Sequence, residues 1–328
     1  MTILNSHPTP RVWTPEELED HAQIALEKFV DRRLAEPGIK YHEHVKCRRE
    51  AIVRLFKALA DVDAQNPQPE KVRAILLDDE LFDALRYVPA PPVSEDDLGV
   101  LVTRRIEGIK KTAIKKDERL PVDVLKLVCK LADPYRFPWI AAGRPATKQE
   151  LRAAIESTMV IHASQSLQTE RRGYGKVVER MLEERLEALG FIKVSGQRPK
   201  KGEPPVPPFP KKGIISQPSH HPTYPHFYGE CTVYGRKVDL FIALATGRMV
   251  ALEAKDSSSG LNSTKRLLND TSAKAKHYEK EAGRNIISVA LLSGVFKVEN
   301  LKKAQDDGLY LVWAHGIDGF IDWIQSQS

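Results

Sequence analysis

Cysteine is scarce in this sequence, and long apolar runs are missing from it. The three cysteines, Cys47, Cys129 and Cys231, are far apart, which excludes a small disulfide-stapled fold and favours a reducing compartment. No run approaches the roughly 18 apolar residues that a membrane span needs, and the first residues lack the basic and apolar regions of a signal peptide. We therefore expect a cytoplasmic protein with no membrane partner.

An overall excess of one charge is also small, because the net charge is +6 with 50 basic and 44 acidic residues. That excess is concentrated in residues 171–212, which hold 11 Lys or Arg and 5 Asp or Glu, whereas the rest of the chain carries 39 of each sign. A localised basic segment indicates contact with a polyanion such as nucleic acid. A solvated helix face that runs into a charged linker would have the same composition.

Residues 1–165 carry the signals of a largely helical region. Capping boxes open two of its helices, at Thr14 and at Thr147, and proline-containing segments separate the helices from one another. The apolar spacing predicts helices over 14–34, 42–62, 94–114 and 147–169. The composition of this region names no function by itself.

From residue 166 to residue 328 the pattern predicts an α/β fold with a mixed central sheet flanked by helices. An amphipathic helix comes first and ends at Gly190. Its predicted apolar side consists of Val177, Met181, Leu182, Leu186 and Leu189. A proline-rich connection over 198–212 follows. The pattern then predicts strands over 230–244, 248–255, 286–292 and 309–314, and helices over about 271–283, 298–306 and 317–325.

A short turn joins the first two of these strands. The residues Ala245-Thr246-Gly247 have the composition of a three-residue hairpin loop in which Gly247 supplies the left-handed conformation. In that register Leu244 pairs with Arg248. A slip of one residue would move every side chain of the strand to the other face, so this register decides which side chains meet.

Three charged side chains interrupt the same strand pair. The predicted register places Asp239 directly opposite Glu253, with their Cβ atoms roughly 5 Å apart. Lys255 lies two residues beyond Glu253 and therefore shares its face of the sheet. Two carboxylates this close repel unless a cation lies between them, and oxygen ligands suit Mg²⁺. With a lysine beside them, they form a set suited to hydrolysis of a phosphodiester, although a surface ion triad would give the same short pattern.

The segments "VDLFIAL" and "VALEAK" resemble the core of the PD-(D/E)xK nucleases, with Asp239, Glu253 and Lys255 as the signature. Ala254 stands where a cysteine is expected, and Val238 stands in place of the signature proline, which many members also lack. More of the chain is similar to type II restriction endonucleases of the XamI/SalI kind. The segments that carry this similarity are 85–98, 133–147, 166–173, 253–275 and 291–317.

The resemblance implies a PD-(D/E)xK restriction-endonuclease-like core in residues 166–328 that uses Mg²⁺ to cleave double-stranded DNA. It implies a homodimer acting on a palindrome, for which relatives suggest GTCGAC, and a separately encoded DNA methyltransferase as functional partner in restriction–modification and phage defence. The helical residues 1–165 would then serve DNA recognition or dimerisation. A structure-selective repair or recombination nuclease, and a DNA-binding protein with an inert nuclease core, are the alternatives.

Further site residues follow from position along the chain. Glu179 lies on the helix before the first core strand, where similar nucleases often place an extra acid, so we expect it to join Asp239 and Glu253 as a metal ligand; an exposed helix glutamate is the alternative. Asp270 is expected to cap a helix. The expected DNA contacts are Gln168, Arg171 and Arg172 before that helix, and Ser258, Asn262, Ser263, Lys265 and Arg266 in a polar loop after Lys255.

A histidine-rich segment offers one further candidate metal site. Its possible ligands are His220, His221, His226 and Cys231. Their spacing matches no recurrent zinc pattern, so we expect DNA contact or packing from them instead.

Overall fold

A computed structural model describes residues 9–63, 66–105, 109–194 and 209–327. The chain divides into two compact units. The first, which we call the sheet unit, consists of residues up to Leu34 together with Arg172–Ser328, and the second, the helical unit, consists of Ala35–Arg171. The sequence suggested a single division near residue 165, whereas here the N-terminal residues belong with the sheet.

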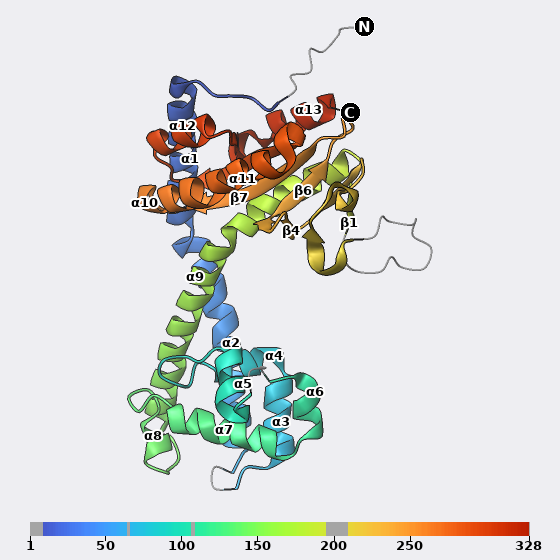
Figure 1. The fold of residues 1–328 in the computed structure, drawn as a ribbon. Coiled ribbons are helices and arrows are strands. Elements are labelled where there is room, and N and C mark those ends of the chain that lie inside the picture. The colour runs from blue at the N-terminus through green and yellow to red at the C-terminus, as the bar shows by residue number, and fades with distance from the viewer. Residues whose placement is uncertain (1–8, 64–65, 106–108, 195–208, 328) are drawn as a thin grey trace. The chain divides into compact units, whose positions relative to one another are not determined.

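The described part of the sheet unit contains short and medium strands and the helices that cover them (Figure 1). The strands are β1 (Ile192–Val194), β2 (Ile214–Ile215), β3 (His226–Tyr228), β4 (Cys231–Val233), β5 (Arg236–Val238), β6 (Leu240–Ala243), β7 (Met249–Ser257), β8 (Ile286–Gly294) and β9 (Tyr310–Trp313). The helices are α1 (Pro15–Ala35), α10 (Gly260–Ser263), the π-helical segment η4 (Thr264–Ser272), α11 (Ala273–Ala282), α12 (Val298–Asp306) and α13 (Ile317–Ser326).

Six of the strands form a mixed sheet in the order β1-β3-β6-β7-β8-β9. β7 is a long central strand, antiparallel to β6 and parallel to β8, which is parallel to β9. A second sheet has the order β2-β4-β5. The predicted mixed α/β architecture is therefore confirmed at this level, and the helices predicted over 298–306 and 317–325 are found as α12 and α13.

The predicted hairpin register is also confirmed. Leu240 pairs with Leu252, and the ladder continues without a slip to Ala243 and Met249. The amide of Leu244 donates to the carbonyl of Arg248 at 2.9 Å. Gly247 has φ +81°, the left-handed conformation that glycine adopts without a steric penalty.

The alternation of the strands gives the sheet two apolar faces. On one face, Leu240, Ile242 and Leu252 pack in a core with side chains of α9 (Lys148–Ala188) and α13. On the opposite face, Phe241 and Ala251 pack with Tyr278 of α11. Because side chains alternate along a strand, Glu253 and Lys255 project on the same side as Ala251, toward α11.

The helix α1 packs against the sheet unit although its sequence reads as part of the helical region. Leu18, Ala22 and Ala25 belong to one core with residues of β8, β9 and α12. Near the other end of α1, Arg32 forms an ion pair with the buried Asp256 of β7 at 3.2 Å. The capping box at Thr14 is formed as predicted, since Glu17 N–H donates to Thr14 Oγ1 at 3.2 Å.

Two predicted helices differ from the structure. The helix predicted over 94–114 ends at Thr103, because Arg104 adopts a left-handed conformation with φ 57°. The helix predicted over 147–169 does not end there but continues through the next predicted helix as α9.

The buried face of α9 was also partly mispredicted. Val178, Leu182 and Leu186 are buried, whereas Val177 and Met181 are exposed. Spacings of four keep the three buried side chains on one helical face, and Val177 lies one position off that face. The proline-rich connection predicted over 198–212 lies mostly outside the described residues.

The helical unit has its own apolar core, made largely by α2 (His42–Ala60), α3 (Pro69–Leu77), α4 (Asp79–Leu85) and α7 (Arg119–Leu131). Its other helices, apart from the part of α9 that it contains, are the π-helical segment η1 (Pro37–Tyr41), α5 (Glu95–Thr103), α6 (Lys111–Lys116) and α8 (Pro138–Ala141).

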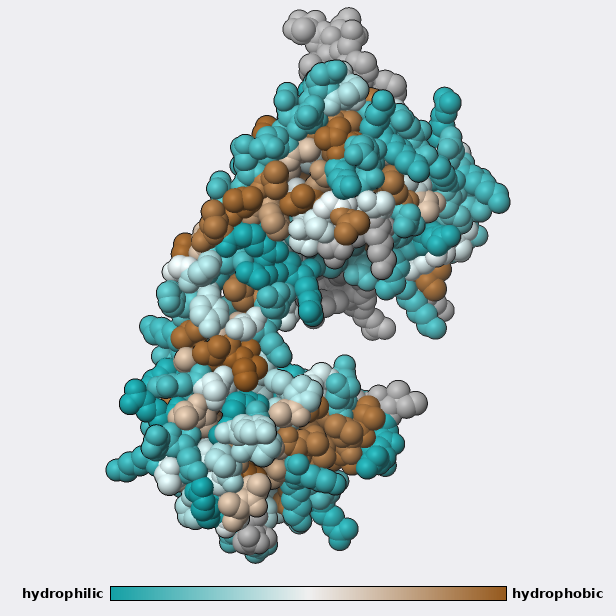
Figure 2. Space-filling model, turned by 90° about the vertical axis from the view of Figure 1, so that its left-hand side faces the viewer, coloured by the Kyte–Doolittle hydropathy of each residue, from teal (hydrophilic) through white to brown (hydrophobic). Residues whose placement is uncertain are grey.

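Surface composition agrees with the amphipathic helices. Figure 2 shows mainly hydrophilic residues on the visible face, with hydrophobic residues in small scattered groups. Among the residues that the structure describes, no helix combines the length and apolarity needed to cross a membrane.

Candidate active site

Asp239 occupies a bend between β5 and β6, next to the central strand β7. Its amide donates to the carbonyl of Leu252 at 3.0 Å, and its Oδ2 accepts from the amide of Ala254 at 2.8 Å. The extrapolated register predicted that Asp239 pairs with Glu253. The regular ladder ends at Leu240 and Leu252, so this pairing is not formed. The bend instead directs its carboxylate to the backbone between Glu253 and Lys255.

Glu253, on the neighbouring strand β7, has a buried carboxylate, with 5% of the residue's surface exposed. Its Oε2 accepts from Lys255 Nζ at 2.6 Å, and its Oε1 accepts from Lys274 Nζ at 2.6 Å. Both oxygens are therefore held by ammonium groups. Such charge-assisted bonds compensate for the cost of burying a carboxylate.

Lys255 joins Glu253 to a second acid, because its Nζ lies 3.0 Å from Asp270 Oδ2. Burial opposes the charged form of Lys255, but the charges of Glu253 and Asp270 outweigh it and raise the lysine's pKa. Burial likewise opposes ionisation of Asp270, and Lys255 and Lys274 outweigh it and lower that pKa. Asp270 lies within η4 and holds these lysines, which corrects the expectation that it caps a helix.

A second ion-pair group lies on the α9 side of Asp239. Lys176 Nζ is 2.9 Å from Glu179 Oε2 and 3.9 Å from Asp239 Oδ1. Glu179 is buried, with 8% exposure, so the exposed helix glutamate considered from the sequence is excluded. Burial raises the pKa of Glu179, the hydrogen bond from Lys176 opposes this rise, and the negative charge of Asp239 adds to it.

Two glycines bring backbone segments close together at this site. A Cβ on Gly175 of α9 would lie 3.8 Å from the carbonyl oxygen of Ala254, so the helix passes directly beside β7. A Cβ on Gly294, at the end of β8, would lie 2.1 Å from the carbonyl oxygen of Ser257. Gly294 also has φ +89°, so only glycine fits where β7 and β8 leave the sheet.

The acids do not form a three-ligand cluster. Within the described part of the chain, no three His, Cys, Asp or Glu side chains are arranged to hold one metal ion. Asp239 is linked to the Glu253 strand by its hydrogen bond from the Ala254 amide. Glu179 and Asp239 are linked by Lys176, whose ammonium group lies near both carboxylates.

The residues expected to contact DNA have different environments. Gln168 and Arg172 are exposed on α9, but Arg171 is engaged by the buried Glu36 at 2.6 Å. Ser263 is fully buried and donates to the carbonyl of Gly260 at 2.6 Å, so its side chain is not accessible for the expected DNA contact.

The segment after Lys255 is helical rather than the polar loop that its composition suggested, because α10 begins at Gly260 and η4 continues from it. Ser258 lies just before it and is exposed. The side chains of the remaining expected contacts, Asn262, Lys265 and Arg266, lie outside the described residues.

The histidine-rich segment packs by separate contacts. His221 lies 3.1 Å from the hydroxyl of Tyr234, and the Nδ1 of His226 lies 2.7 Å from the carbonyl oxygen of Thr223.

Two lysines of the site were not anticipated from the sequence. Lys274 follows Asp270 by four residues and Lys176 precedes Glu179 by three, and both spacings place the paired side chains on one helical face. The available signal was therefore local, but such pairs are common on helix surfaces. Only the folded structure shows that both lysines face carboxylates beside β7.

Comparison with known proteins gives an independent result. The family model described as XamI restriction endonuclease matches residues 65–313. The type II restriction enzyme XamI of Xanthomonas campestris pv. amaranthicola is 32% identical over 283 residues, which cover 84% of this chain and 93% of that enzyme. This chain belongs to the XamI restriction endonuclease family. No solved structure matches it.

Membership in the XamI family assigns the chain to the type II restriction endonucleases, which are site-specific deoxyribonucleases. The residue range matched by the family model includes Glu179, Asp239, Glu253 and Lys255. The ion-pair groups described above therefore lie within the part of the chain that matches the family.

Proposed function

We propose that this chain hydrolyses phosphodiester bonds of double-stranded DNA in a Mg²⁺-dependent reaction at a PD-(D/E)xK-type site made by Asp239, Glu253 and Lys255. The observation that carries the proposal is the 2.8 Å hydrogen bond from Ala254 N–H to Asp239 Oδ2. Because Ala254 lies between Glu253 and Lys255, this bond fixes the three charged side chains around one short stretch of β7. The XamI family assignment supports the same activity.

The donor atoms fit a hard divalent cation, because they are carboxylate oxygens. Asp239 Oδ1 faces Lys176 at 3.9 Å, beyond hydrogen-bond distance, and would be available to a cation. Asp239 and Glu253 would hold the ion, with Glu179 as a neighbouring carboxylate. When bound, Mg²⁺ would supply Lewis-acid polarisation of the scissile phosphodiester.

Lys255 would act as a positioned hydrogen-bond donor and positive charge. Its ammonium group is held between Glu253 at 2.6 Å and Asp270 at 3.0 Å. Two anchors fix its direction without further reorganisation, which is the condition for stabilising charge that develops on a phosphate in the transition state. We assign Lys255 this role and Glu179 the role of supporting the position of Asp239 through Lys176.

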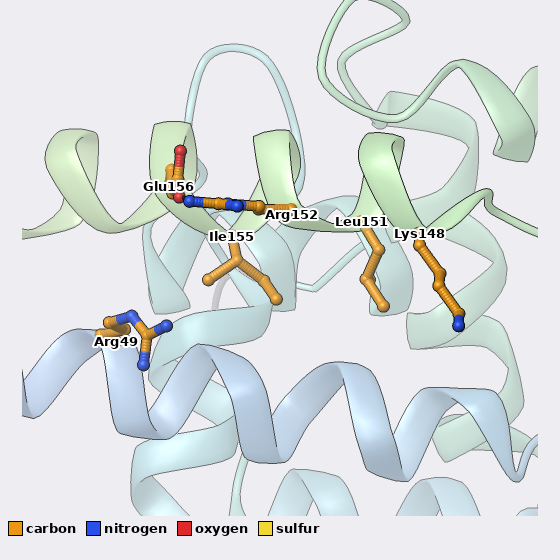
Figure 3. Close-up of a pocket in the computed structure, with 6 residues that line it drawn as sticks. All are labelled: Arg49, Lys148, Leu151, Arg152, Ile155 and Glu156. Carbon is orange, nitrogen blue, oxygen red and sulfur yellow. The ribbon is translucent and has the colours of Figure 1, made fainter.

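The helical unit offers a surface suited to the DNA backbone. A cavity of about 210 Å³ lies between α2 and α9, and its lining includes Arg49 and Lys148, together with Arg152 and Glu156, which pair with each other at 3.0 Å. Figure 3 shows Leu151 and Ile155 pointing from α9 toward α2, with Arg49 at one end and Lys148 at the other. Basic side chains at a groove favour phosphate contacts, so we propose that this unit takes part in DNA binding.

Cleavage at a palindrome would suit a homodimer, because a two-fold axis of the protein then matches that of the site. We propose GTCGAC or a closely related palindrome as the target, on the basis of the resemblance to enzymes of the XamI/SalI kind. A separate methyltransferase would protect the same sequence, and the protein would act in the cytoplasm against incoming phage DNA.

Digestion of plasmid and phage DNA with Mg²⁺ tests the proposal. Discrete fragments ending in one sequence are expected from the wild-type protein. Asp239→Asn should lower the cleavage rate by about 10³-fold or more, because it removes a charge that acts in the transition state, while DNA binding in a filter or gel assay persists.

The matched control for Asp239→Asn is Glu230→Gln, which removes an exposed carboxylate that also contacts Lys176. It should cut at close to the wild-type rate. A smear of fragments would point to a structure-selective or general nuclease, and undigested DNA would rule out an active endonuclease. Normal cutting by Asp239→Asn would refute the site assignment.

A further inference from the structure

Lys274 is placed where a metal ion would have to compete with it. We propose that Lys274 is a built-in counter-ion that occupies Glu253 Oε1 and thereby sets the affinity of the site for a divalent cation. This inference rests on the proposed Mg²⁺-dependent function. It assigns to Lys274 a positioning role exerted through Glu253.

The contacts of Lys274 show that it is part of the site's interior. Its Nζ lies 2.6 Å from Glu253 Oε1, 3.4 Å from Asp270 Oδ1 and 2.9 Å from the carbonyl oxygen of Lys237. The side chain is 14% exposed. A surface lysine that merely increases solubility would have neither this enclosure nor three fixed acceptors.

Both carboxylate oxygens of Glu253 are occupied while the two lysines are in place. Lys255 holds Oε2 and Lys274 holds Oε1, each at 2.6 Å. A cation that takes an oxygen of Glu253 as a ligand must therefore displace or shift one ammonium group. Of the two, Lys274 keeps more acceptors when it gives way.

The remaining acceptors of Lys274 are Asp270 and the Lys237 carbonyl, whereas Lys255 would keep Asp270 alone among its partners in the described residues. Lys274 is also the second residue of α11, which begins directly after the π-helical segment η4. The geometry therefore points to Lys274 as the group that yields.

Electrostatics gives the sign of the effect. A unit positive charge a few ångströms from a divalent cation opposes its binding, and the opposition is strong where water is partly excluded. If Lys274 served only to hold Glu253 in place, removing it would loosen the carboxylate and weaken metal binding. If it is a competing counter-ion, removing its charge will tighten metal binding.

Calorimetric titration of the full-length protein with MgCl₂, in the absence of DNA, separates these possibilities. Lys274→Met should lower the Kd for Mg²⁺ by about tenfold or more. Lys274→Arg, which retains the charge, should stay within about twofold of the wild type.

The matched control is Lys276→Met, on the same helix. Lys276 is 60% exposed and pairs with Asp307 at 2.7 Å, so its loss should leave the Kd unchanged. Lys274→Gln provides a second neutral variant that keeps a hydrogen-bond donor for the Lys237 carbonyl. Thermal unfolding of every variant identifies any that fail to fold.

The outcomes distinguish this inference from the function on which it rests. If the wild type binds Mg²⁺ and both folded neutral variants bind it equally or more weakly, Lys274 is not a counter-ion, and the proposed nuclease site stands. If neither the wild type nor any folded variant binds Mg²⁺, the inference about Lys274 is refuted, and only failure of the wild type to cleave DNA with Mg²⁺ would refute the metal-dependent function as well. Tighter binding by Lys274→Met and Lys274→Gln, and not by Lys276→Met, supports the inference.

Discussion

Each unit of this chain buries ionisable side chains in a charged network, and the two networks balance their charge in opposite ways. In the helical unit, His162 is 1% exposed, and its Nε2 lies 2.9 Å from Asp83 Oδ2. Arg86 pairs with the same carboxylate, and Arg48 lies 3.1 Å from it. Burial opposes ionisation of Asp83, but His162 and the two arginines outweigh it and lower its pKa to about 2.

The network in the sheet unit is rich in acids instead. Its carboxylates are Glu179, Glu230, Asp239, Glu253 and Asp270, and its ammonium groups are Lys176, Lys237, Lys255 and Lys274. One consequence is that the pKa of Glu179 is raised, mainly by burial and further by Asp239.

The difference indicates what each network is suited to do. The negative charge of Asp83 is fully compensated, because two arginines contact this one carboxylate. Such an arrangement suits a structural link between helices. A group in which the carboxylates outnumber the ammonium groups, and in which the pKa of one carboxylate is raised, carries negative charge that its own lysines do not balance. Both networks contain a carboxylate with a shifted pKa, so the shift alone does not separate them, and what distinguishes the acid-rich network is that it lies on the central strand.

Removal of the Asp83 carboxylate in the helical unit should give the largest effect on stability. Asp83→Asn leaves His162 and two arginines without their shared charge, so we expect a loss of about 2–4 kcal/mol in the unfolding free energy of this unit. Hydrogen exchange of the amides of α4 and of residues 148–171 of α9 during mild denaturation would measure this loss for the helical unit alone.

Asp79→Asn on the same helix is the control, since Asp79 is 78% exposed and pairs with Lys111 at the surface. It should cost less than about 1 kcal/mol. At low temperature the folded Asp83→Asn protein should cut DNA as the wild type does. Equal stability of the two variants, or a selective loss of cutting by folded Asp83→Asn, would break the contrast between a structural and a functional network.

A pH titration tests a pair of half-buried histidines in the sheet unit. In the sheet unit, His315 Nε2 lies 2.9 Å from His21 Nδ1. Burial, and then the charges of His21 and Lys28, lower the pKa of His315 to about 4. A histidine whose folded pKa is below its usual value of about 6.5 contributes stability that is present above that value and is lost as the pH falls toward about 4.

Urea unfolding of the sheet unit at a series of pH values should therefore show that the free energy of unfolding declines as the pH falls from about 6.5 to about 4. His315→Asn should flatten this decline, because the half-buried imidazole that resists protonation is gone. An unchanged slope in His315→Asn would mean that the His21–His315 contact does not control the acid sensitivity of this unit.

Much of the site could be predicted because its determinants are local in sequence. The turn at Gly247 fixes the β6–β7 register, and strand alternation then places Glu253 and Lys255 on one face. The strand pair needed no knowledge of the rest of the chain. The extrapolation failed at Asp239, where the strand bends and the carboxylate turns to the amide of Ala254. It also failed upstream, because the single strand predicted over 230–244 is divided into β4, β5 and β6, and β4 and β5 belong to the second sheet.

The remaining features depend on contacts between distant segments. The sequence of α1 is that of an ordinary capped helix, and nothing in it shows that Leu18 packs against the sheet unit. The role of Lys274 depends on where α11 lies relative to β7, and the burial of Ser263 depends on Asn300 of α12, whose amide lies 3.3 Å away. Helical periodicity predicts that a helix forms, but it does not identify its neighbour.

The smallest effect is expected at the β6–β7 turn. A substitution there tests whether the acid-rich network depends on this turn. Gly247 has φ +81°, and a Cβ at this position would find open space among the described residues. Gly247→Ala should therefore cost only the left-handed strain of about 1 kcal/mol. Four ladder pairs still hold the register, and cleavage should remain close to the wild-type rate.

Gly294→Ala is the contrasting variant, because its Cβ would meet the Ser257 carbonyl oxygen at 2.1 Å. The end of β7 would have to move, so both stability and cleavage should fall more than in Gly247→Ala. Denaturant unfolding and cleavage rates of the two variants measure the difference. If Gly247→Ala abolished cutting while remaining folded, the site would depend on the turn itself and not on the β6–β7 ladder.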